Sequence, residues 1–118
     1  MSVKVGLALI ILLSGCIPKP AHGTASWYST KESKGVMANG KALNDKAFTA
    51  ASWDYPLGAR VRACVQYKGP CVVVKIADRG PNRRLRSRGR ILDLTPAAFK
   101  ALAPLSAGII NVTVEPIK

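Results

Sequence analysis

Two of the six acidic side chains occupy positions that suit acid–base chemistry. Asp78 ends a β-branched run and begins the turn Asp78-Arg79-Gly80-Pro81, where a carboxylate can point into a cleft. Asp93 interrupts the apolar run Ile91–Leu94, and burial there would raise its pKa and keep the carboxyl protonated, as a general acid requires. Each acid also has a structural interpretation, because Asp78 could cap its turn and Asp93 could pair with an arginine such as Arg90.

Basic and aromatic side chains are the other candidates for a binding site. An arginine-rich segment joins the two acids and could form either a solvated loop or a rim that contacts anions: Arg83, Arg84, Arg86, Arg88 and Arg90. Four aromatic side chains could stack on sugar rings, although we expect at least two of them in the core: Trp27, Tyr28, Trp53 and Tyr55. The only histidine, His22, precedes the predicted domain, which excludes a serine–histidine–acid triad there.

Strand patterns dominate the segments that must position these residues. β-branched or alternating apolar runs, separated by glycine, proline and asparagine turns, predict strands over residues 24–29, 61–65, 72–76, 91–94 and 109–115. One helix is predicted from Pro96 to Ala103, with Thr95 as its N-cap and Pro104 as its stop. Many short strands with one or two short helices predict a mainly β fold, a compact β-barrel.

Two of the three cysteines are predicted to form a disulfide. Cys64 and Cys71 lie in neighbouring apolar stretches joined by the turn-like Lys68-Gly69-Pro70, so a hairpin would place them opposite each other. In the chain-entropy model, closing a loop of this size stabilises a fold by roughly 2–3 kcal/mol. A zinc site is the alternative, but zinc takes three or four ligands and the predicted domain has no histidine, so we expect no metal.

The N-terminal segment has the pattern of a bacterial lipoprotein signal peptide. Lys4 supplies a basic start, Val5–Leu13 is an apolar run too short to span a bilayer, and Leu13-Ser14-Gly15-Cys16 follows it. We therefore expect a signal peptide over residues 1–15, lipidation of Cys16, a tether over residues 16–22 and a folded domain over residues 23–118. An ordinary signal peptide with an incidental cysteine is the alternative.

The chain is strongly basic, with a formal net charge of +12. Removing Lys4 with the signal leaves 17 basic and 6 acidic side chains, a balance of +11. Such a balance predicts attraction to polyanions or anionic surfaces. Outside the cytoplasm these are phospholipid head groups, lipopolysaccharide, teichoic acid and the carboxylates of peptidoglycan stem peptides. An extracellular nucleic-acid binder would rest on charge alone, and we expect no nucleic-acid partner.

Six short motifs occur in an order that resembles a known family. They are Gly23-Thr24-Ala25-Ser26-Trp27-Tyr28, Ala38-Asn39-Gly40, Thr49-Ala50-Ala51, Pro56-Leu57-Gly58, Asp78-Arg79-Gly80-Pro81 and Gly89-Arg90-Ile91-Leu92-Asp93-Leu94. Together they resemble the rare lipoprotein A family, the septal ring lytic transglycosylases, over residues 23–115. The resemblance implies a six-stranded double-psi β-barrel, related to expansins and barwin, that uses no cofactor.

The resemblance also implies an enzyme, a lyase that cleaves the glycan strands of peptidoglycan and prefers strands without stem peptides. In such enzymes a carboxylic acid protonates the bond after N-acetylmuramic acid, and the 6-hydroxyl of the same sugar attacks, leaving a 1,6-anhydro end. The catalytic acids of the family map to Asp78 and Asp93, and because Asp78 lies in the more specific motif, we expect its loss to cost the most activity, with Asp93 close behind. Side chains that bind the substrate are expected at Trp27, Tyr28, Asn39, Arg79 and Arg90.

The chain departs from the family pattern at three polar positions. Lys41 stands where glutamate is usual, Asn44 where aspartate is frequent, and Ser52 where histidine is usual. These departures leave a second function open, a non-catalytic, expansin-like protein that binds peptidoglycan without cutting it. Both functions place the protein in the cell envelope, lipid-anchored to a membrane and facing the periplasm or the exterior, and we expect a monomer.

Overall fold

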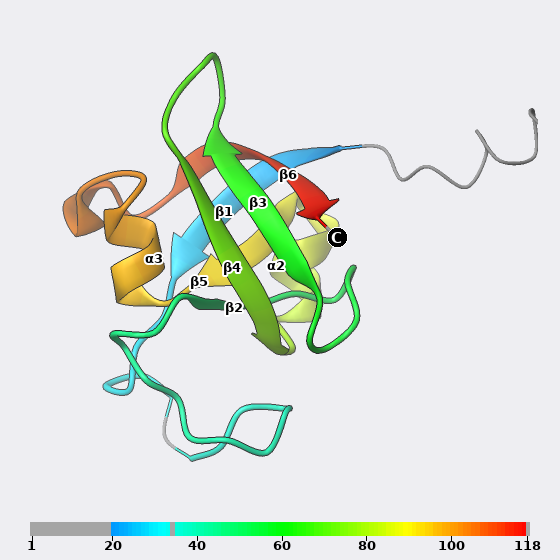
Figure 1. Ribbon diagram of the computed structural model, residues 1–118, viewed down its shortest axis with the longest axis vertical. Helices are drawn as coiled ribbons and strands as arrows, with labels where there is room; N and C mark the ends of the chain where they lie inside the picture. The colour runs from blue at the N-terminus through cyan, green and yellow to red at the C-terminus, as the bar shows by residue number, and fades with distance from the viewer. Residues whose placement is uncertain (1–19, 34, 118) are drawn as a thin grey trace, which may run out of the picture.

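Six strands close into one barrel in the computed structural model, which describes residues 20–33 and 35–117 (Figure 1). Around the barrel the strands are β1 (Ala21–Trp27), β5 (Arg90–Leu94), β2 (Thr49–Ala51), β4 (Cys71–Asp78), β3 (Arg60–Val65) and β6 (Ile110–Ile117), which returns to β1. The predicted signal peptide, Cys16 and most of the predicted tether lie outside the described residues. The mainly β barrel predicted from the sequence is confirmed.

The barrel contains two parallel pairs, and these decide where strand ends meet. β1 pairs with β5 and β2 pairs with β4 in parallel, whereas the other neighbours are antiparallel. Parallel strands end at the same edge, so the last residues of β1 and β5 lie together, Trp27 beside Leu94. The ends of β2 and β4 meet in the same way, Ala51 beside Asp78.

Alternating side chains from the strands fill the barrel. In β3 the apolar Val61 and Ala63 are fully buried, while the intervening Arg60 and Arg62 are exposed, as the two-residue period of a strand requires. Phe99 adds the largest fully buried side chain of the described residues. It comes from the short helix α3 (Pro96–Lys100), which starts as predicted, because Thr95 Oγ1 accepts a hydrogen bond from the N–H of Ala98.

Three elements differ from the prediction. β2 was not predicted, since a strand of three residues is too short to display a period. No helix was predicted in the arginine-rich segment, which was left open as a solvated loop or an anion-contacting rim, but Arg83–Ser87 forms the helix α2, whose N-cap Asn82 accepts a hydrogen bond from the N–H of Leu85. Helix α3 ends at Lys100, three residues before the predicted Ala103, and the turn η1 (Leu105–Ala107) follows it.

The domain begins earlier than residue 23. Ala21 and His22, predicted to belong to the tether, are the first residues of β1 and pair with Val114 and Thr113 of β6. His22 Nδ1 also lies 3.1 Å from Thr113 Oγ1. The prediction was wrong by two residues, because Ala and His carry no pattern that separates a strand end from a tether. The next residue, Gly23, packs closely against the neighbouring chain. A Cβ at this position would lie 2.6 Å from the carbonyl oxygen of Gly89.

The predicted disulfide joins Cys64 and Cys71 across the β3–β4 hairpin. The two cysteines are register partners with Cα atoms 4.0 Å apart. The hairpin projects from the end of the barrel opposite the long segment between β1 and β2 (Figure 1). None of the helices within the described residues has the length and the apolar character needed to cross a membrane.

Candidate active site

The two candidate acids lie on neighbouring strands at one level of the barrel. Asp78 at the end of β4 and Asp93 in β5 are both register partners of Ala51, the last residue of β2, which runs between these strands. Register partners point to the same face of a sheet, and two strand spacings separate the Cα atoms of the acids by about 10 Å. The fold therefore brings together two carboxyl groups that are fifteen positions apart in the sequence.

Three hydrogen-bond donors surround Asp78. Its Oδ1 accepts from the backbone N–H groups of Ala38, at 2.9 Å, and Arg79, at 2.8 Å. Its Oδ2 accepts from the phenol of Tyr28, at 3.2 Å. The segment between β1 and β2 thus folds back over the end of β4 and holds this carboxyl group in one orientation.

Asp93 has a different environment. Its half-buried carboxyl accepts a hydrogen bond on Oδ1 from the hydroxyl of Ser26, its register partner in β1. Burial raises the pKa of Asp93, the Ser26 hydrogen bond and the charge of Arg90 oppose this, and the charges of Asp78 and Glu32 add to it. The net result is a pKa above the ordinary value of an aspartate, which favours the protonated form.

One interpretation of the sequence paired Asp93 with Arg90. In the structure Arg90 does not contact Asp93 directly. Its Nη1 donates to Ser26 Oγ at 3.1 Å and its Nε to Thr24 Oγ1 at 3.1 Å. Ser26 therefore stands between the guanidinium and the carboxyl. Among residues 20–33 and 35–117 the ion pairs are Arg62–Glu115 and Arg86–Asp54, and neither includes a candidate acid.

The second carboxyl oxygen of Asp93, Oδ2, has no hydrogen-bond partner among the described residues. Within the described part of the chain, Thr49 Oγ1 is the one side-chain oxygen that is both fully buried and without a hydrogen-bond partner. Asp93 Oδ2 also lacks a partner, so it cannot be fully buried. One carboxyl oxygen is thus held by Ser26 while the other can meet a ligand.

Tyr28 and Trp27 both pack against apolar clusters, the alternative to sugar stacking that we expected for at least two of the four aromatic side chains. Tyr28 packs against Met37, Leu43 and Ala77, and its phenol donates to Asp78. Burial and the neighbouring charge of Asp78 raise the pKa of Tyr28, which keeps the phenol protonated as a donor. Trp27 packs against the core, and its indole N–H donates to the carbonyl oxygen of Leu105 at 3.0 Å.

Arg79 is bound to the backbone of its own domain. Its Nη1 donates to the carbonyl oxygens of Ser52, at 2.8 Å, and Tyr55, at 2.6 Å. The guanidinium therefore fixes the segment after β2 beside Asp78. Asn39 is exposed near the same acid: its N–H donates to the carbonyl oxygen of Ala77, and its side-chain oxygen accepts from the N–H of Lys41.

Helix α2 packs its arginines against the segment after β2. The guanidinium of Arg83 lies 4.1 Å from the ring centre of Trp53, a cation–π contact. Arg86 forms a two-pronged pair with Asp54, with the shortest contact at 2.8 Å. Only part of the predicted arginine rim is therefore free of such contacts within the described residues, namely the exposed Arg84 and Arg88.

The three residues that depart from the family pattern differ in their burial and in their surroundings. Ser52 is fully buried beside Asp78, its N–H donating to the carbonyl oxygen of Asp78 at 3.0 Å and its hydroxyl accepting from the N–H of Asp54. Asn44 is exposed and accepts from the N–H of Lys46 in a turn. Lys41 is exposed and lines a hollow of about 440 Å³ next to Asn39.

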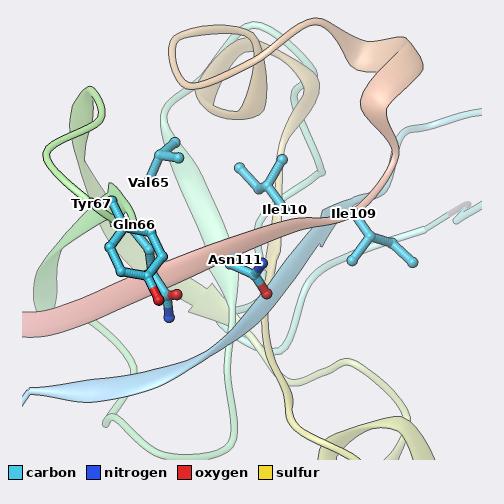
Figure 2. Close-up of a pocket in the computed structure, with 6 residues that line it drawn as sticks. All are labelled: Val65, Gln66, Tyr67, Ile109, Ile110 and Asn111. Carbon is cyan, nitrogen blue, oxygen red and sulfur yellow. The ribbon is translucent and has the colours of Figure 1, made fainter.

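Another hollow, of about 490 Å³, lies at the hairpin end of β3 and contains neither acid (Figure 2). Its lining residues are Val65, Gln66, Tyr67, Ile109, Ile110 and Asn111. Asp78 ends the eight-residue β4, whose opposite end belongs to the same hairpin, about 25 Å away along an extended strand. No group of three or more metal-binding side chains occurs in the described ranges.

The sequence did not identify Ser26 as a site residue. The signal was available, since Ser26 and Tyr28 alternate along the predicted strand and so share one face. What the sequence could not give was the β1–β5 register that sets Ser26 opposite Asp93.

The comparison with known sequences decides the family. A family model described as lytic transglycolase matches residues 20–114. The chain belongs to this family. Lytic transglycolases similar to it include the probable endolytic peptidoglycan transglycosylase RlpA of Synechocystis sp., 39% identical over 93 residues, covering 79% of this chain and 28% of that protein. The endolytic peptidoglycan transglycosylase RlpA of Pseudomonas aeruginosa is 39% identical over 95 residues, covering 80% and 27%.

The chain spans between 25% and 39% of the length of the curated relatives it matches. Solved structures support the fold of the described chain. The Streptomyces papain inhibitor superposes with a TM-score of 0.66 at 25% identity, covering 87% of this chain and 98% of that one. An expansin of Clavibacter michiganensis does so with a TM-score of 0.61 at 25% identity, covering 85% and 51%. The predicted rare lipoprotein A family and double-psi β-barrel are confirmed.

Proposed function

We propose that this domain cleaves the glycan strands of peptidoglycan as an endolytic lytic transglycosylase and leaves 1,6-anhydro-N-acetylmuramic acid ends. Relatives that are 39% identical to it are named endolytic peptidoglycan transglycosylases, one of them as probable. The observation that carries the proposal is the pair of carboxyls at one level of the barrel, one with donors on both oxygens and one half-buried with a raised pKa.

Asp93 is the proton donor in this proposal. Its raised pKa favours the protonated carboxyl, and its Oδ2, which has no partner among the described residues, is available to donate a proton to the oxygen of a glycosidic bond. Ser26 holds the other oxygen, which fixes the plane of the carboxyl group. The sequence alone favoured Asp78 for this role, because its motif is the more specific; the environments of the two acids support the opposite assignment.

Asp78 is the proton acceptor. Its hydrogen-bond partners all donate to it, an arrangement that suits a carboxylate. As Asp93 gives its proton to the leaving oxygen, the bond from C1 of N-acetylmuramic acid to that oxygen breaks. The O6 of the same sugar forms a new bond to C1 and loses its proton to Asp78. The two carboxyls then return to their starting states by exchange with water.

The remaining residues of the site position the acids. Tyr28 and the N–H of Ala38 orient Asp78, while Arg90 orients Ser26. Trp27, Tyr28, Asn39, Arg79 and Arg90 stay proposed contacts of the substrate, with Asn39 the most exposed of them and Arg79 mainly occupied by backbone carbonyls.

We further propose that the mature protein is a monomeric lipoprotein of the cell envelope, anchored by acyl chains on Cys16, which lies outside the described residues. Two or more chains, at about 0.8 kcal/mol for each buried methylene, anchor a protein stably. The short stretch from Cys16 to β1 would then hold the barrel close to the membrane that carries it.

A non-catalytic peptidoglycan-binding protein is the second candidate. The likeness to an expansin and the changed residues Lys41, Asn44 and Ser52 favour it. Incubation of the mature domain with purified sacculi, followed by mass spectrometry of the soluble products, separates the two. The enzyme releases muropeptides that are lighter by one water than their hydrolysed equivalents, whereas the binder adsorbs to sacculi and releases none.

A further inference from the structure

A surface hollow next to Asp78 has two lysines in its wall. It measures about 440 Å³ and is lined by Ala38, Asn39, Lys41, Leu57, Gly58 and Lys75. Two of its lining residues are bonded to the end of β4: the N–H of Ala38 donates to Asp78, and the N–H of Asn39 donates to the carbonyl oxygen of Ala77, the residue before it. Whatever occupies this hollow therefore lies beside the proposed catalytic carboxyl.

Positively charged side chains lie close together around the hollow. Lys75 of β4 and Arg60 of β3 are direct register partners, and both side chains are exposed. Like charges placed opposite each other destabilise an antiparallel pair. Lys41 adds a third positive charge from the turn after Asn39. This arrangement costs stability unless something negative balances it.

No carboxylate of the described residues balances these charges. The ion pairs within residues 20–33 and 35–117 use Arg62 with Glu115 and Arg86 with Asp54. Asp78 turns its oxygens to Ala38, Arg79 and Tyr28 instead. The hollow thus offers two lysine ammonium groups, and a third cation beside one of them, to a ligand.

We propose that Lys41 and Lys75 form a subsite for a carboxylate carried by the glycan strand, adjacent to the bond that is cut. The proposal rests on the proposed function and deepens it. The substrate of that function carries such groups at every second sugar, either as the lactyl carboxylate of a muramic acid without a stem peptide or as the carboxylates of an attached peptide. Compact ammonium groups suit a carboxylate that approaches from solvent.

The subsite also explains why a lysine at position 41 would be useful to this chain. This position departs from the family pattern, where glutamate is usual, so the positive charge of the wall is a property of this chain. A lysine at position 41 makes the hollow attractive to the anion that a glutamate would repel. The subsite would select strands by their charge, in addition to the selection by sugar shape.

Binding of soluble glycan oligomers to the Asp93→Asn domain tests the subsite separately from catalysis. The probes are a peptide-free oligomer with its lactyl carboxylates, the same oligomer with those groups converted to methylamides, an oligomer with stem peptides, and a chitin oligomer of equal length. The double variant Lys41→Gln/Lys75→Gln is compared with Lys46→Gln/Lys100→Gln, which removes two exposed lysines outside the hollow.

The subsite predicts that Lys41→Gln/Lys75→Gln weakens binding of the carboxylate oligomer by roughly 3- to 10-fold at low salt, as expected for two exposed charge contacts. The control pair and the amidated and chitin oligomers should show no such loss. A loss confined to the peptide-free strand identifies the lactyl group, and a loss confined to the peptide-bearing strand identifies the peptide. An equal loss for the amidated oligomer, or none for either charged strand, overturns the subsite. Because no bond is cut in this assay, a failure of the proposed cleavage would leave its result readable.

Discussion

Asp78 and Asp93 share one neighbour, Ala51, which pairs with the first in a parallel ladder and with the second in an antiparallel one. This three-strand arrangement fixes the spacing of the two carboxyls through backbone hydrogen bonds. Their surroundings then differ, since donors hold both oxygens of Asp78, whereas Ser26 holds one oxygen of Asp93 and leaves the other open. Unequal environments are what allow two carboxyls to take opposite roles in one reaction.

The raised pKa of Asp93 predicts how activity and stability depend on pH. A general acid must be protonated, so formation of anhydro products should fall as the pH rises through the raised pKa of Asp93. Between the ordinary and the raised pKa, the folded state binds more protons than the unfolded state, and the free energy of unfolding decreases as the pH rises. Thermal unfolding of wild type and Asp93→Asn across this window checks the sign. The variant should lose this part of the pH dependence, and an unchanged dependence would assign it to other groups.

Arg90 should tune Asp93 through its charge. Its guanidinium lowers the pKa of Asp93, so Arg90→Gln should raise that pKa and move the alkaline limb of the pH–rate profile to higher pH. Arg88→Gln, an exposed change nearby, is the matched control and should leave the limb in place. A lower rate with no movement of the limb would mean that Arg90 acts only through structure.

Arg79 should matter for stability more than for contact with the glycan. Arg79→Gln removes the bonds from its guanidinium to the carbonyl oxygens of Ser52 and Tyr55, and bonds to a charged group contribute roughly 1.5–3 kcal/mol each. We expect a clear drop in the melting temperature, measured by circular dichroism, beside an unchanged Arg84→Gln control. Full stability together with lost binding to sacculi would show that the guanidinium serves the substrate instead.

The disulfide should stabilise the hairpin without taking part in the reaction. Cys71 begins β4, at the end away from Asp78, and Cys64, seven positions earlier, lies near the end of β3. Replacing both by serine should cost roughly 2–3 kcal/mol of unfolding free energy in the chain-entropy model. Denaturant unfolding of the variant, and of wild type with and without reductant, measures this. Loss of product formation under conditions where the variant is still folded would contradict the separation of hairpin and site.

Cys16 should decide where the protein resides. Cys16→Ala removes the thiol to which a diacylglycerol group would be attached, so the protein should leave the membrane fraction and be processed slowly. Fractionation of cells that carry either form, with a lipid-anchored and a soluble envelope protein as markers, gives the readout. An unchanged distribution would favour an ordinary signal peptide with an incidental cysteine.

The sequence predicted the strands that display a pattern and missed what depends on pairing. Val61–Val65 and Val72–Ile76 alternate or carry β-branched side chains, and both lie within observed strands. Thr49–Ala51 is a strand only because β4 and β5 flank it, which no local pattern encodes. No helix was predicted over Arg83–Ser87 because the segment has no apolar stripe. The helix forms through Asn82 and through contacts with Trp53 and Asp54.

The candidate site likewise contains residues that the sequence could predict and residues that depend on the fold. Asp78 and Asp93 were identified from their motifs and from their positions at or within apolar strands. The partners that give them different environments, Ser26 and the N–H of Ala38, follow from register and from the fold of a loop. A backbone N–H carries no sequence signal at all, so this part of the chemistry becomes visible only in three dimensions.

The central claim is that Asp93 delivers the proton that breaks the glycan strand. The direct measurement is the initial rate of 1,6-anhydro product formation from purified sacculi by wild type and Asp93→Asn, with Glu115→Gln as an exposed acidic control. Removing a general acid typically costs about 10²- to 10⁴-fold in rate. The account predicts a loss of that size in Asp93→Asn, with binding to sacculi and the melting temperature near those of wild type. A variant that releases anhydro products at the wild-type rate would contradict it.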